Sequence, residues 1–372
     1  MRAPETRREA RRIMEICNAC RYCEGYCAVF PAMELRRNFA KDDVIYLANL
    51  CFECRACFYA CPYTPPHDYG VNIPEVLSAL RVETYADYTG PRVLSRLFAG
   101  KGFVVALTVA LAVALVFGAV LLIQGPSAVF STNTGTGAFY ELVPYLAMVI
   151  PALLLSAYCL AAFVTGGLRF WRETRGSLGQ VLDLRSFLRA TKDAFGLEYL
   201  KGGGAGCNYP DDKASPARRW FHHLVLGGFL LDLASTTLAA IYHNFLGRDA
   251  PYPYLSGPVV LGTVGGALLA GGVLGLLWLK QRADPEPAHA PMLTLDLIFL
   301  WLLLLTSLTG LALLVLRETA AMGTLLALHL GVVTGLFLTL PYGKFAHVIY
   351  RYAALVKYQI EQPDEASASP IS

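Results

Sequence analysis

The chain has 372 residues, of which 55% are hydrophobic and only 16% are charged. Soluble domains usually carry roughly 25% charged residues, so the composition argues against an ordinary soluble enzyme and indicates that much of the chain lies in lipid. The formal net charge is +3. Membrane topology accounts for the basic residues, so no nucleic acid is expected as a partner.

Eight of the ten cysteines fall into two matching runs near the N-terminus, each with the spacing C-x2-C-x2-C-x3-C. This spacing is typical of proteins with two [4Fe–4S] clusters, in which the fourth cysteine of each run binds the cluster of the other run. The second run ends in the Cys-Pro pair of bacterial ferredoxins, whereas Ala28 follows the first run. The predicted ligands are Cys17, Cys20, Cys23 and Cys61 for the first cluster, and Cys51, Cys54, Cys57 and Cys27 for the second.

Disulfides and zinc sites fit these cysteines less well. Disulfides need an oxidising compartment, and the five arginines among the first twelve residues precede no apolar run that would indicate a signal peptide. Zinc usually binds two pairs of cysteines in a tetrahedral site, which two runs of four thiolates match poorly. Paired iron–sulfur clusters are therefore the prediction.

Six apolar segments follow, each about as long as the 20 residues that a helix needs to cross a bilayer. The predicted fold is mainly α: an N-terminal α-helical ferredoxin-like domain with two [4Fe–4S] clusters, fused to a six-helix transmembrane bundle. The predicted domains are residues 1–90, a transmembrane domain at 91–350 that includes a loop at 166–220, and a tail at 351–372. The predicted spans lie at about 103–123, 142–165, 221–242, 258–280, 295–316 and 322–342.

Lysine and arginine are concentrated on one side of these spans. The segment 166–220 holds ten of them, whereas the loops on the opposite side hold only Arg248 and Arg317. Because basic residues are retained on the cytoplasmic side, we expect a multi-pass protein of the cytoplasmic (inner) membrane, with both termini and the cluster domain in the cytoplasm.

The segment 166–220 is too long for a plain connection. Residues 181–189 predict an amphipathic surface helix, and the glycines at 202–206 predict irregular backbone. Cys159 and Cys207 lack partner cysteines and are interpreted as structural. The glycine-rich setting favours a place for Cys207 near a cofactor.

Five histidines flank or enter the membrane helices: His222, His223, His243, His329 and His347. The third and sixth helices run antiparallel, so these histidines form facing pairs, one pair near each membrane surface. Imidazoles from facing helices are the axial ligands of b-type haem, and one or two haems are predicted. Helical phase relative to His243 favours His222 over His223 as a ligand.

A histidine at a helix end can instead meet interfacial water, which applies most to His223, His243 and His347. His329 lies inside a span, where an ionisable residue is costly and usually functional. Asp232, near the middle of the third helix, is expected to face the bundle interior. There it either joins a proton path or bonds a neighbouring hydroxyl.

Several motifs occur in one order along nearly the whole chain: CPYTPPH at 61–67, GGGAGCNYP at 202–210, RWFHH at 219–223, APY at 250–252 and LPYGKF at 340–345. Together they resemble the tricarballylate-utilisation protein B family, also called citrate-utilisation protein B. Asp232 departs from the family pattern, in which an apolar or small residue is more usual.

The resemblance implies a role beside a soluble FAD-dependent dehydrogenase that oxidises tricarballylate to cis-aconitate. The membrane protein would reoxidise the reduced flavin and pass electrons to the quinone pool. The chain lacks a G-x-G-x-x-G motif opening a βαβ unit, so the flavin belongs to the partner. No catalytic residue is predicted. The alternatives are a di-haem subunit of another respiratory complex, which moves electrons across the membrane, and a membrane anchor with a structural cluster.

Overall fold

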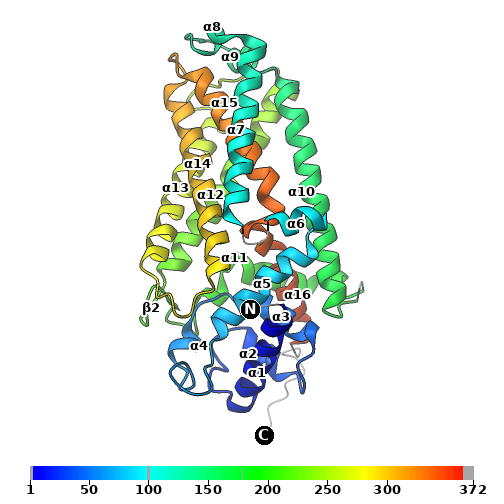
Figure 1. Ribbon diagram of the computed structural model, residues 1–372. Coiled ribbons are helices and arrows are strands. Elements are labelled where there is room, and N and C mark those ends of the chain that lie inside the picture. The colour runs from blue at the N-terminus through cyan, green and yellow to red at the C-terminus, as the bar shows by residue number, and fades with distance from the viewer. Residues whose placement is uncertain (1–2, 99–100, 178, 363–372) are drawn as a thin grey trace.

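The computed structural model describes residues 3–98, 101–177 and 179–362. It has a helical head at one end and a long helical bundle above it (Figure 1). Helices account for 73% of the residues, which confirms the predicted fold class. We call the end of the bundle that meets the head the head end, and the opposite one the far end.

The head is built from short helices around the two cysteine runs. Its helices are α1 (Ala3–Cys20), α2 (Val29–Glu34), α3 (Lys41–Leu50), α4 (Ala56–Tyr59) and α5 (Ile73–Tyr88). Ile13, Phe30 and Leu77 are almost fully buried between these helices. Asn72 starts α5 because its side chain accepts a hydrogen bond from the Glu75 amide.

In the described parts of the chain, six helices are long and apolar enough to cross a membrane, as predicted, and the protein is a multi-pass membrane protein. They are α7 (Gly102–Gln124), α10 (Tyr145–Glu173), α12 (Ala217–Leu246), α13 (Gly257–Gln281), α14 (Ala290–Leu316) and α15 (Met322–Thr339), which η3 (Leu340–Tyr342) continues.

Several of these helices extend beyond the predicted spans. α10 continues to Glu173, so Arg169 and Arg172 belong to a helix and not to the predicted loop. α12 starts at Ala217 and includes Arg218. Hydropathy detects the part of a helix that lies in hydrocarbon and misses polar turns that project beyond it.

Shorter elements complete the fold: α6 (Arg92–Phe98), α8 (Pro126–Val129), α9 (Ala138–Leu142), η1 (Gly179–Leu182), α11 (Leu184–Gly196), η2 (Glu198–Leu200), η4 (Lys344–Ala346) and α16 (His347–Glu361). The strands β1 (Cys207–Asn208) and β2 (Ala214–Ser215) pair antiparallel, with Cys207 opposite Ser215.

The expected amphipathic helix is α11, which Asp183 caps at its N-terminus. It buries Ser186 and Ala190, and it exposes Leu184 and Leu188.

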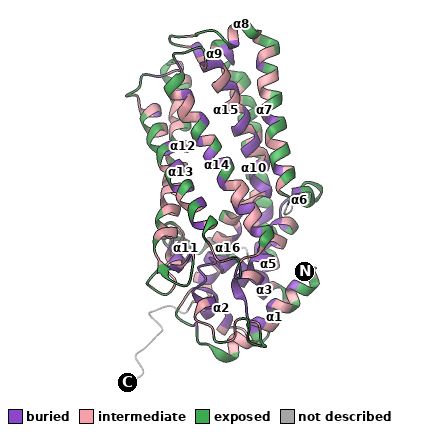
Figure 2. Ribbon diagram, turned by 60° about the vertical axis from the view of Figure 1, so that its left-hand side comes forward, coloured by how far each residue is buried: buried purple, intermediate pink, exposed green. Residues whose placement is uncertain are grey.

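The head and the bundle share one hydrophobic core. Residues 351–361, predicted as part of a tail, form most of α16, and Ala354 and Leu355 on that helix are buried with the head residues. Trp171 of α10 and Leu295 of α14 belong to the same cluster. Figure 2 shows buried residues gathered in the head and at the bundle centre, with more exposed faces on the outer helices. The predicted tail end at 363–372 lies outside the described residues.

Glycines let α12 and α13 approach closely. A Cβ added at Gly228 would lie 2.5 Å from the Leu269 amide nitrogen and 2.7 Å from the Gly265 carbonyl oxygen. A Cβ at Gly272 would lie 2.8 Å from the Phe221 carbonyl oxygen. Small residues at such contacts stabilise membrane helix pairs through backbone packing.

We expect Gly228→Ala to lower the free energy of unfolding by about 1–3 kcal/mol, because backbone atoms on α13 cannot move aside for the new methyl group. Thermal unfolding of the detergent-solubilised protein, followed by circular dichroism, measures the change. Gly227→Ala is the matched control, since a Cβ there meets nothing within 4 Å. Equal stability of the two variants would contradict the close packing.

Candidate metal centres

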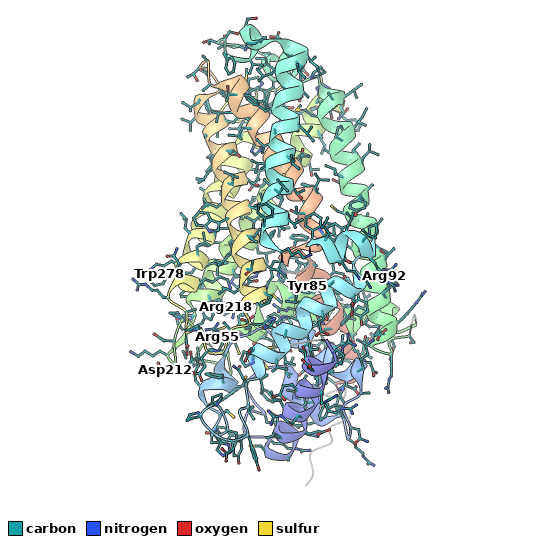
Figure 3. All side chains as sticks on the ribbon, viewed as in Figure 1. Arg55, Tyr85, Arg92, Asp212, Arg218 and Trp278 are labelled. Atoms are coloured by element: carbon teal, nitrogen blue, oxygen red, sulfur yellow. The ribbon has the colours of Figure 1, made fainter. Side chains whose placement is uncertain are left out.

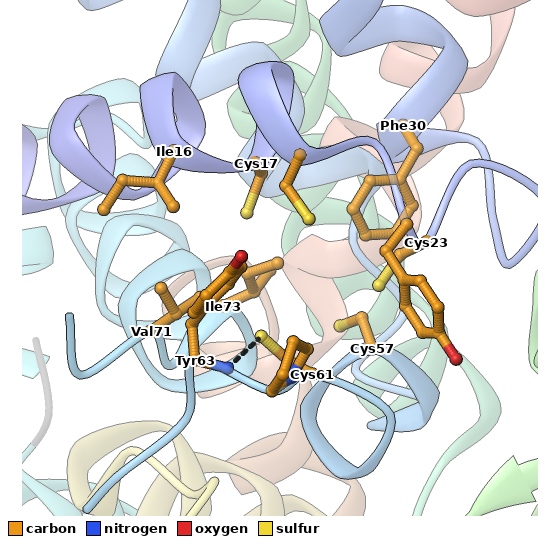
Figure 4. A pocket seen from close by; sticks show the side chains of 12 residues that line it. Ile16, Cys17, Cys23, Phe30, Cys57, Cys61, Tyr63, Val71 and Ile73 are labelled. Carbon is orange, nitrogen blue, oxygen red and sulfur yellow. Dashed lines mark hydrogen bonds between the residues drawn. The ribbon is translucent and has the colours of Figure 1, made fainter. Parts of the chain in front are cut away.

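The predicted cluster ligands surround two neighbouring cavities in the head. Cys17, Cys20, Cys23 and Cys61, with Cys57 at the border, line the first cavity. Figure 4 shows the sulfurs of Cys17, Cys23, Cys57 and Cys61 directed into this space. Cys27, Cys51, Cys54 and Cys57 line the second cavity. The fold therefore brings the fourth cysteine of each run to the other run, and the metal assignment stays a prediction.

Helix ends and turns position these cysteines. Cys17 and Cys20 lie in the last turn of α1, three residues apart and therefore on one face. Cys51 follows the end of α3, and Glu53 and Arg55 then adopt left-handed backbone conformations, with φ of 56° and 65°. This backbone turns the loop sharply before Cys57 on α4.

Amide groups support two of the sulfurs. The Glu53 amide donates to Cys51 Sγ at 3.4 Å, and the Tyr63 amide donates to Cys61 Sγ at 3.3 Å (Figure 4). Hydrogen bonds from amides favour the thiolate over the thiol, and in iron–sulfur proteins they also tune the reduction potential.

The donor set suits a cluster better than a single ion. Burial raises the pKa of the Cys17 and Cys23 thiols to about 12, and neighbouring cysteines contribute to the same rise. Burial also raises the pKa of Cys27 and Cys57 well above its usual value. A bound metal centre offsets this effect, because it binds and stabilises the thiolate form.

Within residues 3–98, 101–177 and 179–362, no three His, Cys, Asp or Glu side chains are close enough to hold one metal ion. In a cubane each thiolate binds a different iron, so its ligands stand farther apart. The residues present fit [4Fe–4S] clusters because the four predicted ligands of each cluster line one cavity.

The two cavities differ in exposure. Cys20, at the first cavity, is exposed to solvent. Cys51, Cys54 and Cys57, at the second cavity, are only 6%, 6% and 8% exposed. The first site therefore lies at the surface of the head, and the second lies inside.

The segment between α11 and α12 binds the backbone of the second cysteine run. The Asn208 amide donates to the Cys54 carbonyl at 2.9 Å. The expected irregular backbone is present: Gly203 has a φ of 85°, and a Cβ there would meet the Tyr26 ring at 3.0 Å. Cys207 is fully buried, and its thiol donates to the Leu200 carbonyl at 3.2 Å.

Three arginines hold the loop that carries Cys51. Arg81 and Arg351 each donate to the Cys51 carbonyl at 2.9 Å. Arg218 donates to the Glu53 carbonyl at 2.5 Å. The carboxylate of Glu53 lies 2.9 Å from Arg81; burial raises the pKa of Glu53, but Arg81 together with Lys344 and Lys280 brings the pKa below its usual value. These arginines come from α5, α16 and α12, so no local sequence pattern links them to the cysteines.

A second buried charge cluster lies where the head meets the bundle. Asp296 on α14 contacts Lys280 and Lys344, each at 2.5 Å. Burial lowers the pKa of Lys344 to about 8, although Asp296 opposes this shift. In the sequence, Lys280 and Lys344 are basic residues at or just after the ends of two apolar spans. The retention of basic residues on the cytoplasmic side is enough to explain such residues, so the sequence carries no separate sign of a buried cluster.

Two of the five histidines face each other at the head end. The ring centroids of His222, on α12, and His347, at the start of α16, are 6.3 Å apart. His347 Nδ1 donates to the Lys344 carbonyl at 2.6 Å, so the lone pair is on Nε2. His222 Nδ1 is buried and has no hydrogen-bond partner among the described residues. Phe345, two residues before His347, lies 5.7 Å from the rings of Phe163 and Phe229.

The adjacent His223 points elsewhere. Its Nε2 lies 3.1 Å from the Phe195 carbonyl of α11, and its ring contacts Trp220. His222 and His223 thus have different partners, and the preference for His222 as a haem ligand stays a prediction.

The histidines toward the far end contact different partners and not each other's rings. His243 Nδ1 lies 2.7 Å from the Asp249 carboxylate, and its ring stacks on Tyr145 at 3.7 Å. His329 Nδ1 lies 2.9 Å from the Thr309 hydroxyl. That hydroxyl donates to the Leu305 carbonyl at 2.8 Å, so His329 is the donor to it.

Asp232 is half-buried at the contact between α12 and α13, against Gly265. This position faces a helix neighbour, as expected for a costly side chain inside a span.

We expect the purified anaerobic protein to contain close to eight irons, four in each of two clusters. Cys17→Ser and Cys51→Ser should each remove one cluster preferentially, because each change removes a ligand from a different cavity. Iron analysis and EPR spectroscopy measure both effects.

Cys207→Ser is the matched control and should keep both clusters, since Cys207 lines neither cavity. Zinc in place of iron, or one cluster that survives both ligand changes, would overturn the assignment.

Comparison with known proteins identifies the family. The family model described as Citrate utilization protein B Fer4-like domain matches residues 10–87, and the model described as Citrate utilization protein B matches residues 99–368. The chain is 45% identical over 361 residues to Citrate utilization protein B of Escherichia coli, covering 96% of this chain and 93% of that protein. No solved structure matches the chain. The Fer4-like domain supports an iron–sulfur electron-transfer role. The chain belongs to the citrate utilization protein B family.

Proposed function

We propose that this protein reoxidises the reduced flavin of a soluble partner dehydrogenase and conducts the electrons to the membrane quinone pool. One observation carries the proposal: an exposed thiolate site, a buried thiolate site and a facing histidine pair follow one another from the head surface into the bundle. The relative's name refers to citrate utilisation, and the family resemblance makes tricarballylate the proposed substrate of the partner.

The thiolate sites suit stepwise transfer. When bound, a [4Fe–4S] cluster accepts and donates one electron at a time, so two of them let a two-electron donor such as reduced flavin discharge in steps. Cys20 and the 66%-exposed Tyr22 bring the first site to the surface, where a soluble partner can approach. The buried cysteines of the second site keep water away from the next step.

His222 and His347 are the residues that would hold the iron of a proposed b-type haem. A metal held between two imidazole nitrogens at about 2 Å from each leaves the ring centroids roughly 6 Å apart, and these centroids are 6.3 Å apart. The Lys344 carbonyl fixes the tautomer of His347, as carbonyl acceptors do for metal-binding histidines. Phe345 and its aromatic neighbours supply the apolar surroundings.

The distribution of basic residues supports a head in the cytoplasm and a chain in the cytoplasmic (inner) membrane. The segment 166–220 and α16 at the head end are rich in lysine and arginine, and such residues are retained on the cytoplasmic side.

A second candidate function is electron transfer across the membrane with a further haem near the far end. It is favoured by the way His243 and His329 are held: each has Nδ1 engaged, by Asp249 and Thr309, in the manner of His347. The contacts of His243 and His329 argue against this candidate function, because the two rings have different partners and do not face each other.

We expect reduced-minus-oxidised absorbance spectra of the protein to contain a b-type haem signal that His222→Ala and His347→Ala abolish. His223→Ala is the matched control, because the adjacent ring points to α11, and should keep the signal. His329→Ala should leave the head-end haem intact; loss of a signal in that variant would instead support the far-end haem. A haem-free protein that still reduces quinone would contradict the haem proposal.

Single-turnover mixing tests the whole function. Reduced flavoprotein should reduce the clusters, and a quinone analogue should reoxidise them at a rate that Cys54→Ser lowers severely, because that change interrupts the buried site. Cys159→Ser, whose thiol donates to the Phe337 carbonyl of α15, is the control and should react normally. If flavin reoxidation in membranes is unchanged by loss of this protein, the electrons travel by another route.

A further inference from the structure

We propose that four arginines around the second cavity, Arg55, Arg81, Arg218 and Arg351, give the cluster there a higher reduction potential than the cluster in the first cavity. We call these residues the arginine collar. The collar directs electrons inward, from the surface site to the buried one. The inference rests on the proposed function for the two clusters, but it requires neither the flavoprotein nor a haem.

Two collar members bind the backbone of a ligand residue. Arg81, 1% exposed, donates to the Cys51 carbonyl at 2.9 Å and also contacts the Glu53 carboxylate at 2.9 Å. Arg351 donates to the same carbonyl at 2.9 Å, and its guanidinium lies 4.3 Å from the centroid of the Phe52 ring, which lines the cavity.

The other two members meet across one aromatic ring. Arg55 lines the cavity, is 2% exposed and lies 4.4 Å from the centroid of the Tyr209 ring. Arg218 lies 5.0 Å from the same centroid and donates to the Glu53 carbonyl. Figure 3 shows Arg55 and Arg218 near each other, where the head meets the bundle.

The collar carries a surplus of positive charge. Arg81 pairs with the Glu53 carboxylate, whereas Arg218 and Arg351 donate to carbonyls of the cluster loop, and Arg55 donates to the Asp284 carbonyl at 2.9 Å. A carbonyl acceptor leaves the charge of a guanidinium uncompensated. Arg55 thus lines the second cavity, and three further cations bind the loop that carries Cys51, where the carboxylate of Glu53 pairs with one of them.

Buried donors also remain unused beside this cavity. The Nε–H groups of Arg55, Arg81 and Arg351 are buried and have no acceptor among the described residues. A buried, unsatisfied donor is costly, and an anionic group in the cavity offsets that cost. The thiolate-bound cluster is such a group.

The first cavity has a different lining. Apart from its cysteines, the described residues around it are apolar or aromatic: Ile16, Tyr22, Phe30, Pro62, Tyr63, Val71 and Ile73. None of them is charged. The lining of the second cavity, by contrast, includes the charged residues Arg55 and Glu53.

The sign follows from the charge of the cluster. A cluster with four thiolates becomes more negative on reduction, so nearby cations favour its reduced state, and burial alone disfavours it. At the second site the cations oppose the effect of burial directly. In the step itself, one electron leaves the reduced first cluster, which is oxidised, and enters the second, which is reduced. No bond breaks and no proton moves.

The collar also connects the second site to the histidine pair. Arg218 precedes His222 by one helical turn on α12, and Arg351 follows His347 by one turn on α16. Arg218 and Arg351 therefore link the loop that carries Cys51 to the helices that carry the rings of His222 and His347.

The test is an EPR-monitored redox titration of the full-length protein in detergent, with chemical mediators. Cys20→Ser identifies the signal of the first cluster. In the unmodified protein, the second cluster should have the higher midpoint potential. Arg351→Met should lower that potential, and Glu53→Gln should raise it, while the first cluster changes little in either variant.

Arg351→Lys keeps the charge and should retain most of the wild-type value. Arg282→Met is the control for loss of an arginine: Arg282 is exposed, stacks on Trp278 and should leave both potentials unchanged. If the Arg351→Met protein loses iron, the other two variants still test the proposal. It requires that Glu53→Gln raises the midpoint potential of the second cluster and that Arg351→Lys keeps most of the wild-type potential.

A second cluster with the lower potential in the unmodified protein would overturn the proposal. So would shifts of the same sign in Arg351→Met and Glu53→Gln. Failure of the proposed function has a different signature, because absent clusters are detected by iron analysis, and absent flavoprotein or quinone activity does not affect a mediated titration.

Discussion

The hydrogen bonds between guanidinium groups and the carbonyls of the Cys51–Arg55 loop hold the two halves of this protein together. The left-handed conformations of Glu53 and Arg55 turn the loop sharply, and buried carbonyls need donors. Those donors arrive from Arg81 in the head, Arg218 on a membrane helix and Arg351 on the C-terminal helix. One short loop thereby determines how head, bundle and C-terminal helix are arranged around the buried thiolate site.

Buried charge recurs at this junction in a second form. Asp296 is held between Lys280 and Lys344, and removing one partner of such a group leaves an uncompensated charge in an apolar setting. An ion pair between specific partners is lost when helices pack in the wrong register, whereas two apolar helix surfaces can slide along each other at little cost. Lys280 on α13, Asp296 on α14 and Lys344 in η4 all belong to the bundle, so these ion pairs fix how the bundle elements pack at the end that meets the head.

Features encoded locally were predictable from the sequence. Cysteine spacing indicated which thiols come together, and the length of apolar segments indicated six membrane helices. Helical phase favoured His222 over His223, and only His222 faces His347. Features made by tertiary packing were not predictable: no local pattern links Arg218 and Arg351 to the Cys51 loop, and residues 351–361 were predicted to be a tail. The contacts of His243 and His329 likewise depend on Asp249 and Thr309, which carry no distinctive spacing.

The wall of the second thiolate site has a practical consequence for anyone who would study the head alone. Asn208, Arg218 and Arg351 all lie beyond the cysteine-bearing segment, yet they bind its backbone. A recombinant fragment that ends after α5 would look like a complete ferredoxin by its cysteines, but it would leave the carbonyls of Cys54 and Glu53 without these donors and that of Cys51 without Arg351. Measurements on such a fragment would describe a cysteine loop without its native hydrogen bonds, so the head is best studied as part of the whole membrane protein.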